Sequence, residues 1–308
     1  MEYRPRLDEE EYNLITDHRA LKKECEEIGI PIEDINHYWH KGKHFSIHAK
    51  KEGISINKLR DKVIKEMNKH SPSYPKIKRK RSNDSHLLVI DPADIHIGKL
   101  ATSFETGEEY NSQIAVKRVK DGVEGILNKA QGFNIDQILF IGGNDILHID
   151  VPSRKTTSGT PQDTDENFLT AKKLYVDILE ILLDIADVRF VYNPSNHDYV
   201  SGFMLSDSIK SWFRKCDNIT FDCSIAHRKG YKYGKNLIGT THGDGAKQAD
   251  LPLIMANEFS KWWSETEHRY VYTHHIHHKT SKDYHGITVE SLRSPSGSDS
   301  WHHRNGYG

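Results

Sequence analysis

The stretch LLVIDPADIHIG, residues 87–98, decides the fold around which the rest of the chain is built. Its four apolar residues, 87–90, predict a buried strand. Pro92 cannot sit inside a central strand, so the strand ends before it. Asp94 and His96 follow in the loop, close enough for a carboxylate oxygen and an imidazole nitrogen to hold one cation. Because open α/β sheets bind ligands at the carboxyl ends of their strands, we expect this loop to form part of a site.

Four later stretches repeat this arrangement of an apolar strand followed by a loop with polar donors. The strands are predicted at 137–141, 188–192, 236–240 and 270–273, and helical patterns at 111–130, 166–186, 206–214 and 253–263 lie between them. The loops carry, in chain order, Asp145 and His148, Asn196 and His197, His242, and His275 and His277. Strands alternating with helices, followed by a mainly β second half, predict a two-sheet α/β sandwich.

The chain of 308 residues is long enough for one large domain and one small one. We predict a small, mainly helical N-terminal domain at 1–68, a basic linker at 69–85, and the domain that carries the polar loops at 86–308. Segment 37–51, HYWHKGKHFSIHAKK, has four lysines and no acid among its aromatic residues. Such a surface can bind phosphates and stack bases. The alternative is that these aromatic residues form the core of the small domain.

Composition excludes several classes of protein. Lys and Arg number 43 and Asp and Glu 44, so net charge does not argue for a polyanion partner, and only the cationic run at 76–81 offers local guidance for a nucleic acid. The three cysteines have neither zinc-type nor disulfide spacing. No apolar run is long enough to span a membrane, and the N-terminus lacks the apolar core of a signal peptide. We therefore expect a cytoplasmic protein without membrane association.

The donors on the five loops are of the types that bind divalent metals. Seven of them could hold two cations about 3.5–4 Å apart, the arrangement used to displace groups at phosphorus. Asp145 lies centrally in chain order and is the candidate for a bridging carboxylate. Mixed carboxylate, amide and imidazole ligands suit Mn, Fe or Zn, and the absence of cysteine among these donors argues against a closed structural zinc site.

The five motifs, DIH, GGND, SNHD, THGD and HHIH, together resemble the signature of the calcineurin-like metallophosphoesterases, D-x-H, GD, GNH(D/E), H and GHxH. The resemblance covers about residues 87–278. It implies a two-sheet α/β sandwich with a dinuclear centre, in which a metal-bound hydroxide attacks the phosphorus. Carried over residue by residue, it gives one metal to Asp94, His96 and His277, the other to Asn196, His242 and His275, and makes Asp145 the bridge.

A narrower resemblance concerns DILH, residues 145–148, which is similar to the D-L-F-H element of DNA-end-processing nucleases of the SbcD type. It implies that His148 contacts the scissile phosphate. His197 matches the family's histidine that stabilises the transition state or protonates the leaving oxygen. The chain departs from the pattern where Asn144 is inserted and where Ser195 and His274 replace glycines. These departures resemble those of a divergent branch such as phage or prophage members.

The leading hypothesis is a metal-dependent phosphodiesterase that hydrolyses DNA, with two divalent cations, most simply Mn²⁺, and with Fe, Zn or Ni as alternatives. DNA is the expected partner, and a homodimer or a partner ATPase is compatible with the sequence. The alternatives are a phosphomonoesterase, a small-molecule phosphodiesterase acting on a cyclic nucleotide, and an inactive binding or scaffold protein. Beside the ligands, Asp91 could orient His275 or His277 or serve only as a turn residue, and Asp198 could orient His197. His274 and His278 are expected beside the ligands or at the surface.

Overall fold

A computed structural model of the chain describes residues 72–79, 84–148 and 164–297, two strands at 37–41 and 46–50, and single helical positions at 19, 20, 22, 23, 26 and 65. The chain divides into two compact units, Met1–His70 and Ser71–Gly308, and each is described by itself. In the part that the structure describes, no helix is long and apolar enough to cross a membrane.

The smaller unit contains a pair of antiparallel strands, β1 (His37–Lys41) and β2 (Ser46–Lys50), with Trp39 opposite His48. Both strands lie in the basic, aromatic segment 37–51. They differ from the mainly helical prediction for this region, and the adjacent aromatic residues Tyr38 and Trp39 are of a type that is enriched in strands. Between residues 51 and 71 the structure describes only position 65, which is helical.

The larger unit is built on two sheets, as the sequence predicts. The first sheet is parallel, in the order β3-β4-β5-β6, with strands β3 (His86–Ile90), β4 (Ile135–Gly143), β5 (Asp187–Asn193) and β6 (Ile219–Asp222). The second is mixed, in the order β10-β11-β9-β8-β7, with strands β7 (Arg228–Tyr233), β8 (Asn236–Thr241), β9 (His268–Thr273), β10 (Thr280–Tyr284) and β11 (Ile287–Ser291). The prediction of a two-sheet α/β architecture is therefore confirmed.

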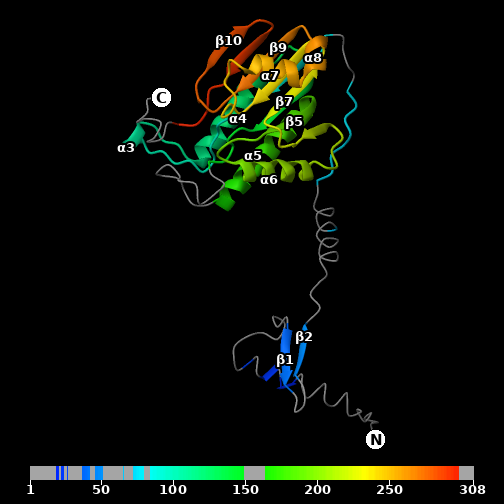
Figure 1. Ribbon diagram of the computed structural model, residues 1–308, viewed down its shortest axis with the longest axis vertical. Coiled ribbons are helices and arrows are strands. Elements are labelled where there is room, and N and C mark those ends of the chain that lie inside the picture. Colours follow the sequence, from blue (N-terminus) through cyan, green and yellow to red (C-terminus); the bar gives the residue numbers. More distant parts are fainter. Residues whose placement is uncertain are drawn as a thin grey trace. The chain divides into compact units, whose positions relative to one another are not determined.

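Helices cover the outer faces of both sheets (Figure 1). Helices α4 (Ser112–Lys129), α5 (Thr164–Ile185) and α6 (Tyr199–Trp212) pack on the four-stranded sheet, and α7 (Leu251–Glu258) and α8 (Ser260–Glu265) on the five-stranded sheet. A short helix, α3 (Ser103–Thr106), precedes α4. The order of layers is thus helices, sheet, sheet, helices.

The alternation of side chains along β4 explains this layering. Ile138 and Phe140 belong to the core cluster shared with α4, α5 and α6, whereas Leu139 and Ile141 belong to a second cluster with Ile238 of the other sheet. Successive side chains of a strand point to opposite faces, so a strand that is apolar at every position must be covered on both sides. The continuous apolar run of β4 therefore requires a helix layer on one face and a sheet on the other.

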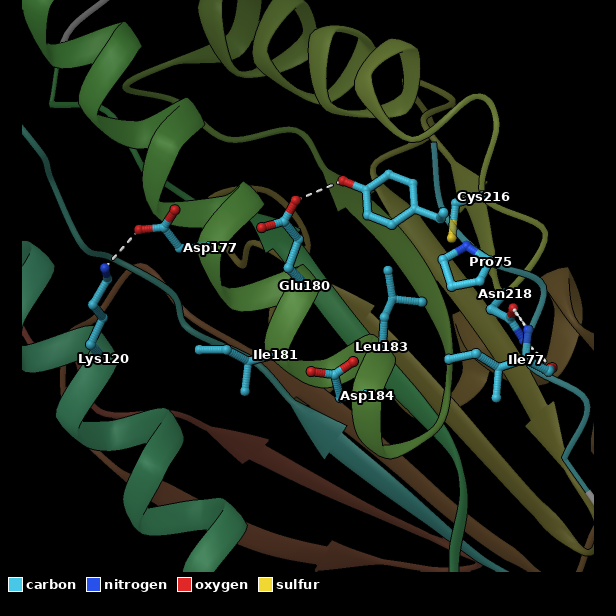
Figure 2. A pocket seen from close by; sticks show the side chains of 11 residues that line it. Pro75, Ile77, Lys120, Asp177, Glu180, Ile181, Leu183, Asp184, Cys216 and Asn218 are labelled. Carbon is cyan, nitrogen blue, oxygen red and sulfur yellow. Dashed lines mark hydrogen bonds and ion pairs between the residues drawn. The ribbon is translucent and has the colours of Figure 1, made fainter. Parts of the chain in front are cut away.

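Residues 72–79 are attached to the outer side of this unit, although they form neither helix nor strand. Asn218 brackets the backbone of Ile77, accepting from its N–H at 2.9 Å and donating to its carbonyl at 2.8 Å. The Tyr74 hydroxyl donates to Glu180 at 2.7 Å and accepts from Trp212 at 3.1 Å. A cavity of about 480 Å³ lies beside this segment, and none of the metal-ligand candidates lines it. Figure 2 shows the side chains that line this cavity.

Two cations of the run at 76–81 are paired within the same unit. Lys76 lies 3.0 Å from Asp217, and Arg79 lies 2.5 Å from Asp187. A cation held against a carboxylate is less available to a phosphate backbone. Lys76 and Arg79 thus help to attach the segment, and residues 80 and 81 lie outside the described residues.

Candidate metal centre

The five polar loops converge at one end of the two sheets. Three of them follow β3, β4 and β5, which are parallel neighbours, and two follow β8 and β9, which pair in parallel in the other sheet. Carboxyl ends of parallel strands meet at one edge, so residues nearly two hundred positions apart become neighbours. The loop after β3 is joined to the loop after β4 by backbone bonds from Asp94 N to Asn144 O, 2.7 Å, and from His96 N to Asp145 O, 2.9 Å.

The backbone at these loops is unusual. Among the described residues, six that are not glycine have positive φ, and all six lie in these loops: Asp94 (50°), His96 (51°), Asn144 (52°), Asp145 (59°), His275 (70°) and His277 (61°). Each such position costs about 1–3 kcal/mol and persists only where its surroundings over-determine it, which is common at functional sites. Asn tolerates this conformation best, so the inserted Asn144 can be accommodated in its turn.

The first group of donors comprises Asp94, His96 and His277, the set expected for one metal. Their ligand atoms all lie within 4.8 Å of one another. The Nε2 atoms of His96 and His277 are 3.2 Å apart, and His277 Nε2 lies 3.8 Å from Asp94 Oδ1. Asp94 and His96 are buried.

The second group comprises Asp145, His242 and His275, again within 4.8 Å of one another. His242 Nε2 lies 3.1 Å from Asp145 Oδ2 and 2.9 Å from Asn196 Oδ1, which brings the amide expected for the second metal into the same group. The backbone N–H of His275 donates to Asp94 Oδ2 at 3.1 Å, so the two groups adjoin. The structure thus brings all seven predicted donors together.

His148 and His197 form a third group with His96. The Nδ1 atoms of His148 and His96 are 3.3 Å apart, and the rings of His148 and His197 stack with centroids 5.3 Å apart. His197 Nδ1 lies 2.7 Å from the carbonyl of His148, and the His197 backbone N–H donates to Asp145 Oδ1 at 3.0 Å. Both histidines expected to act on the substrate therefore lie beside the first group of donors.

Asp198 holds a backbone turn rather than the ring of His197. Its carboxylate accepts from Ser195 Oγ at 2.6 Å and from Leu147 N at 2.9 Å. Ser195 Oγ in turn accepts from the backbone N–H of Asp145 at 2.8 Å. The expectation that Asp198 orients His197 is therefore wrong in its detail. Ser195, a residue that sequence reasoning treated only as a departure from a glycine, supports the turn that carries Asp145.

Asp91 does not contact the ligands that it was expected to orient. Its Oδ2 lies 3.4 Å from Nε2 of His274, and both side chains are buried. Burial and the neighbouring Asp94 raise the pKa of Asp91 well above its usual value, while burial and His242 lower the pKa of His274. The sequence predicts that both residues lie near the site, but not that they contact each other.

The electrostatics of the two groups fit a divalent cation. Burial opposes the charged form of Asp145, but His242 and His197 hold its pKa below the ordinary value. Burial and Asp145 together raise the pKa of Asp94 to about 8. Burial and neighbouring histidines lower the pKa of His96, so its imidazole stays neutral, the form that binds metals. Two buried carboxylates and the neutral imidazole of His96, whose Nε2 lies 3.2 Å from that of His277, are a donor set that a cation would satisfy.

Without metal, we expect the free energy of unfolding to fall as the pH rises from 6.5 to 8. Burial lowers the pKa of His242 and the Asp145 carboxylate raises it, with a net rise from 6.5 to about 9. Asp94 and His242 therefore bind more protons in the folded than in the unfolded chain over this range, so stability decreases with pH. His96 and His275, whose pKa values burial lowers, act in the opposite sense, and their effect fades over this range as the histidines of the unfolded chain lose their protons.

The measurement is the thermal midpoint of chelator-treated protein across this pH range. Mn²⁺ requires deprotonated ligands, so its addition should flatten or reverse the slope. A midpoint of the chelated protein that rises from pH 6.5 to 8 would contradict the expectation.

The fold and the donor groups define a two-sheet α/β protein with a candidate centre for divalent cations. No protein-family model and no curated protein matches the sequence. Among solved structures, the chain is similar to Vps29 of Chaetomium thermophilum, with 13% identity and a TM-score of 0.31, over 69% of this chain and 73% of that one.

Two further solved structures are similar to this chain, with comparably low sequence identities and TM-scores. A novel archaeal phosphodiesterase has 8% identity and a TM-score of 0.33, over 68% of this chain and 83% of that one. A putative 5'-nucleotidase of Staphylococcus aureus has 11% identity and a TM-score of 0.31, over 69% of this chain and 49% of that one. Similarities with such low TM-scores and identities do not establish an activity. The activity has to be inferred from the candidate metal ligands.

Proposed function

We propose that the chain is a metal-dependent phosphodiesterase of the calcineurin-like metallophosphoesterase type and that it hydrolyses DNA. One observation carries the proposal: five loops from two sheets bring seven carboxylate, amide and imidazole donors into two adjoining groups. Two adjoining cations are the arrangement by which proteins displace groups at phosphorus. A scaffold protein would have no need to keep six residues in left-handed conformations around such donors.

The proposed roles of the donors follow the two groups. Asp94, His96 and His277 would hold one cation and Asn196, His242 and His275 the other, with Asp145 between them. When bound, the cations supply Lewis-acid chemistry and lower the pKa of a bound water. The buried positions of Asp94 and Asp145 keep water away from the carboxylates, so their charge acts at low dielectric.

His197 is the candidate proton donor to the leaving oxygen. A carbonyl oxygen only accepts, so the 2.7 Å contact with the His148 carbonyl requires a hydrogen on His197 Nδ1. The transferable proton of His197 is therefore on Nε2, and only the imidazolium form carries it there. The carbonyl contact fixes the ring's orientation, which is what a general acid requires.

His148 is the candidate contact for the phosphate that is cut. Its ring lies against His96 and His197, and the residue is only 5% exposed. A side chain this buried can meet only a phosphate bound inside the centre. This placement supports the role that the DILH motif suggests.

An exposed pair of rings supports a substrate that carries bases. Tyr199, two residues after His197, is 40% exposed, and its ring stacks on that of His227 with centroids 6.0 Å apart. Aromatic side chains that stack on bases contribute about 1–3 kcal/mol per base. The exposed rings are thus close in sequence to the proposed proton donor and could receive a nucleobase.

Tyr199→Ala should raise KM for single-stranded DNA by about 10-fold, the equivalent of about 1.4 kcal/mol. It should leave KM for bis-p-nitrophenyl phosphate within about 2-fold, because that substrate has no base to stack. Tyr270→Ala, at an exposed tyrosine of β9, is the matched control. Equal effects of Tyr199→Ala on both substrates would show that the ring does not read bases.

A substrate panel with metal analysis on the same sample tests the proposed function. With Mn²⁺ the protein should release nucleotides from linear DNA and hydrolyse bis-p-nitrophenyl phosphate. Preference for the p-nitrophenyl monoester, with DNA intact, would identify a phosphomonoesterase. Preference for a cyclic nucleotide would identify a small-molecule phosphodiesterase. No turnover with Mn, Fe, Zn, Ni or Co would favour a scaffold.

A further inference from the structure

Asp91 and His274 lie at the junction of the two sheets, directly before the ligand loops. Asp91 follows the last residue of β3 in the four-stranded sheet, and His274 follows the last residue of β9 in the five-stranded sheet. Their side chains are 4% and 0% exposed and meet at 3.4 Å between Oδ2 and Nε2. Neither carboxylate oxygen of Asp91 and neither ring nitrogen of His274 has a hydrogen-bond partner in the part of the chain that the structure describes. The two side chains thus lie within ion-pair distance of each other at a buried position, without forming a hydrogen bond.

The turn after His274 is strained and carries a ligand at its centre. The backbone N–H of Ile276 donates to the carbonyl of His274 at 2.8 Å, which closes a three-residue turn around His275. His275 has a φ of 70°, the side of the map on which such turns are rare and strained. A strained turn keeps its shape only where both of its ends are held.

The structure holds the start of this turn from three directions. The His274 backbone N–H donates to the carbonyl of His242 at 2.8 Å, and the His275 N–H donates to the Asp94 carboxylate at 3.1 Å. A Cβ added at Gly243 would lie 3.2 Å from the His274 carbonyl, so the loop after β8 packs closely on the same residue. The imidazole of His274 adds one more contact, the 3.4 Å approach of its Nε2 to Asp91 Oδ2.

We propose that Asp91 and His274 are a positioning pair, a buried tie between the two sheets that holds the turn at His275 and so fixes His275 and His277 relative to Asp94 and His96. This inference rests on the proposed function, since it concerns how the metal donors are held. The tie joins the strand ends from which the first group of donors is assembled, Asp94 and His96 on one sheet and His277 on the other. If the tie is lost, the sheets stay packed through their apolar cluster, but the donors lose their spacing.

Calorimetric titration of the chelator-treated protein with Mn²⁺ tests the pair. His274→Leu fills the space without a donor and should weaken Mn²⁺ binding by about 10–100-fold, the usual effect of losing a group that orients ligands. His274→Gln keeps an N–H that can reach Asp91 and should stay within about 3-fold of the unaltered chain. Because the two residues act together, Asp91→Leu combined with His274→Leu should weaken binding no more than either change alone.

Lys229→Met is the matched control. Lys229, which is buried, and Asp222, which is half-buried, form another contact between the sheets, 3.2 Å long, at the opposite edge of the four-stranded sheet. This variant should lower the thermal midpoint of the metal-free protein and leave Mn²⁺ affinity unchanged. If His274 only stabilised the fold, His274→Leu would likewise lower the thermal midpoint and leave Mn²⁺ affinity unchanged.

The outcomes separate the pair from the proposed function. If the unaltered chain binds no Mn²⁺, the metal centre and the pair both fail. If it binds Mn²⁺ and His274→Leu binds it equally well, or if His274→Gln is as impaired as His274→Leu, only the positioning pair is overturned.

Discussion

Asp145→Asn is expected to lower the rate of phosphodiester hydrolysis by about 10³-fold and to reduce the amount of bound metal. The substitution keeps the size of the side chain but removes a buried negative charge that faces His242 Nε2 at 3.1 Å. Metal-assisted charge stabilisation at phosphorus contributes several kcal/mol, and each 1.36 kcal/mol corresponds to about tenfold in rate. A loss of about 4 kcal/mol gives the expected figure.

The matched control for this variant is Asp136→Asn, on the same strand. Asp136 lies near the start of β4 and accepts a hydrogen bond from the Tyr233 hydroxyl at 2.5 Å, whereas Asp145 follows the end of that strand. Metal content from elemental analysis and turnover of bis-p-nitrophenyl phosphate are measured on both. Full metal content and full turnover in Asp145→Asn would remove the central carboxylate from the proposed centre.

The part of the fold that the sequence predicts well is the part in which pattern and burial coincide. Residues 138–141 of β4 are apolar on both faces because both faces are covered, and such a run can be recognised without knowing what covers it. The polar loops were found for the same reason, since each directly follows a strand of this kind.

The elements that the sequence does not predict have no apolar pattern that coincides with burial. Strand β10, TSKDY, is mostly exposed and carries no apolar alternation, so pairing with β11 alone makes it a strand. Helix α6 begins at Tyr199, ahead of the predicted start at 206, because Gly202 lets the first turn approach Asp198, onto whose carbonyl its N–H closes. The strand depends on pairing with its neighbour, and the start of the helix depends on a close approach that only a glycine permits. Neither can be recognised from a local pattern of apolar residues.

The partners of the acidic residues around the donors could not be read from the chain either. Asp198 was expected to orient His197 beside it and instead accepts from Leu147, about fifty residues away. Asp91 was expected to serve His275 or His277 and instead meets His274 across two sheets. The spacing of the motifs predicts which loops reach a common edge of the sheets. Which of two adjacent side chains points inward depends on backbone angles, such as the positive φ at His275, that the spacing does not reveal.

His197→Ala is expected to lower the rate of DNA hydrolysis by about 10²–10⁴-fold while the metal content stays unchanged. The variant keeps the backbone N–H that donates to Asp145 Oδ1 at 3.0 Å, so the carboxylate loses no hydrogen bond. It removes the ring that the His148 carbonyl holds at Nδ1, and with it the proton on Nε2. A group that protonates the leaving oxygen matters most where that oxygen leaves poorly. The loss should therefore be larger for DNA than for bis-p-nitrophenyl phosphate, whose nitrophenolate leaves readily.

The comparison of the two substrates separates a proton donor from a residue that only shapes the site. His268→Ala, at an exposed histidine that begins β9, is the control and should change neither rate. If His197 merely filled space against His148, both substrates would slow by the same factor. If it bound metal, the metal content would fall with the rate. Only a loss that is greater for DNA, at full metal content, assigns proton transfer to His197, because the leaving group is then the one variable to which the defect responds.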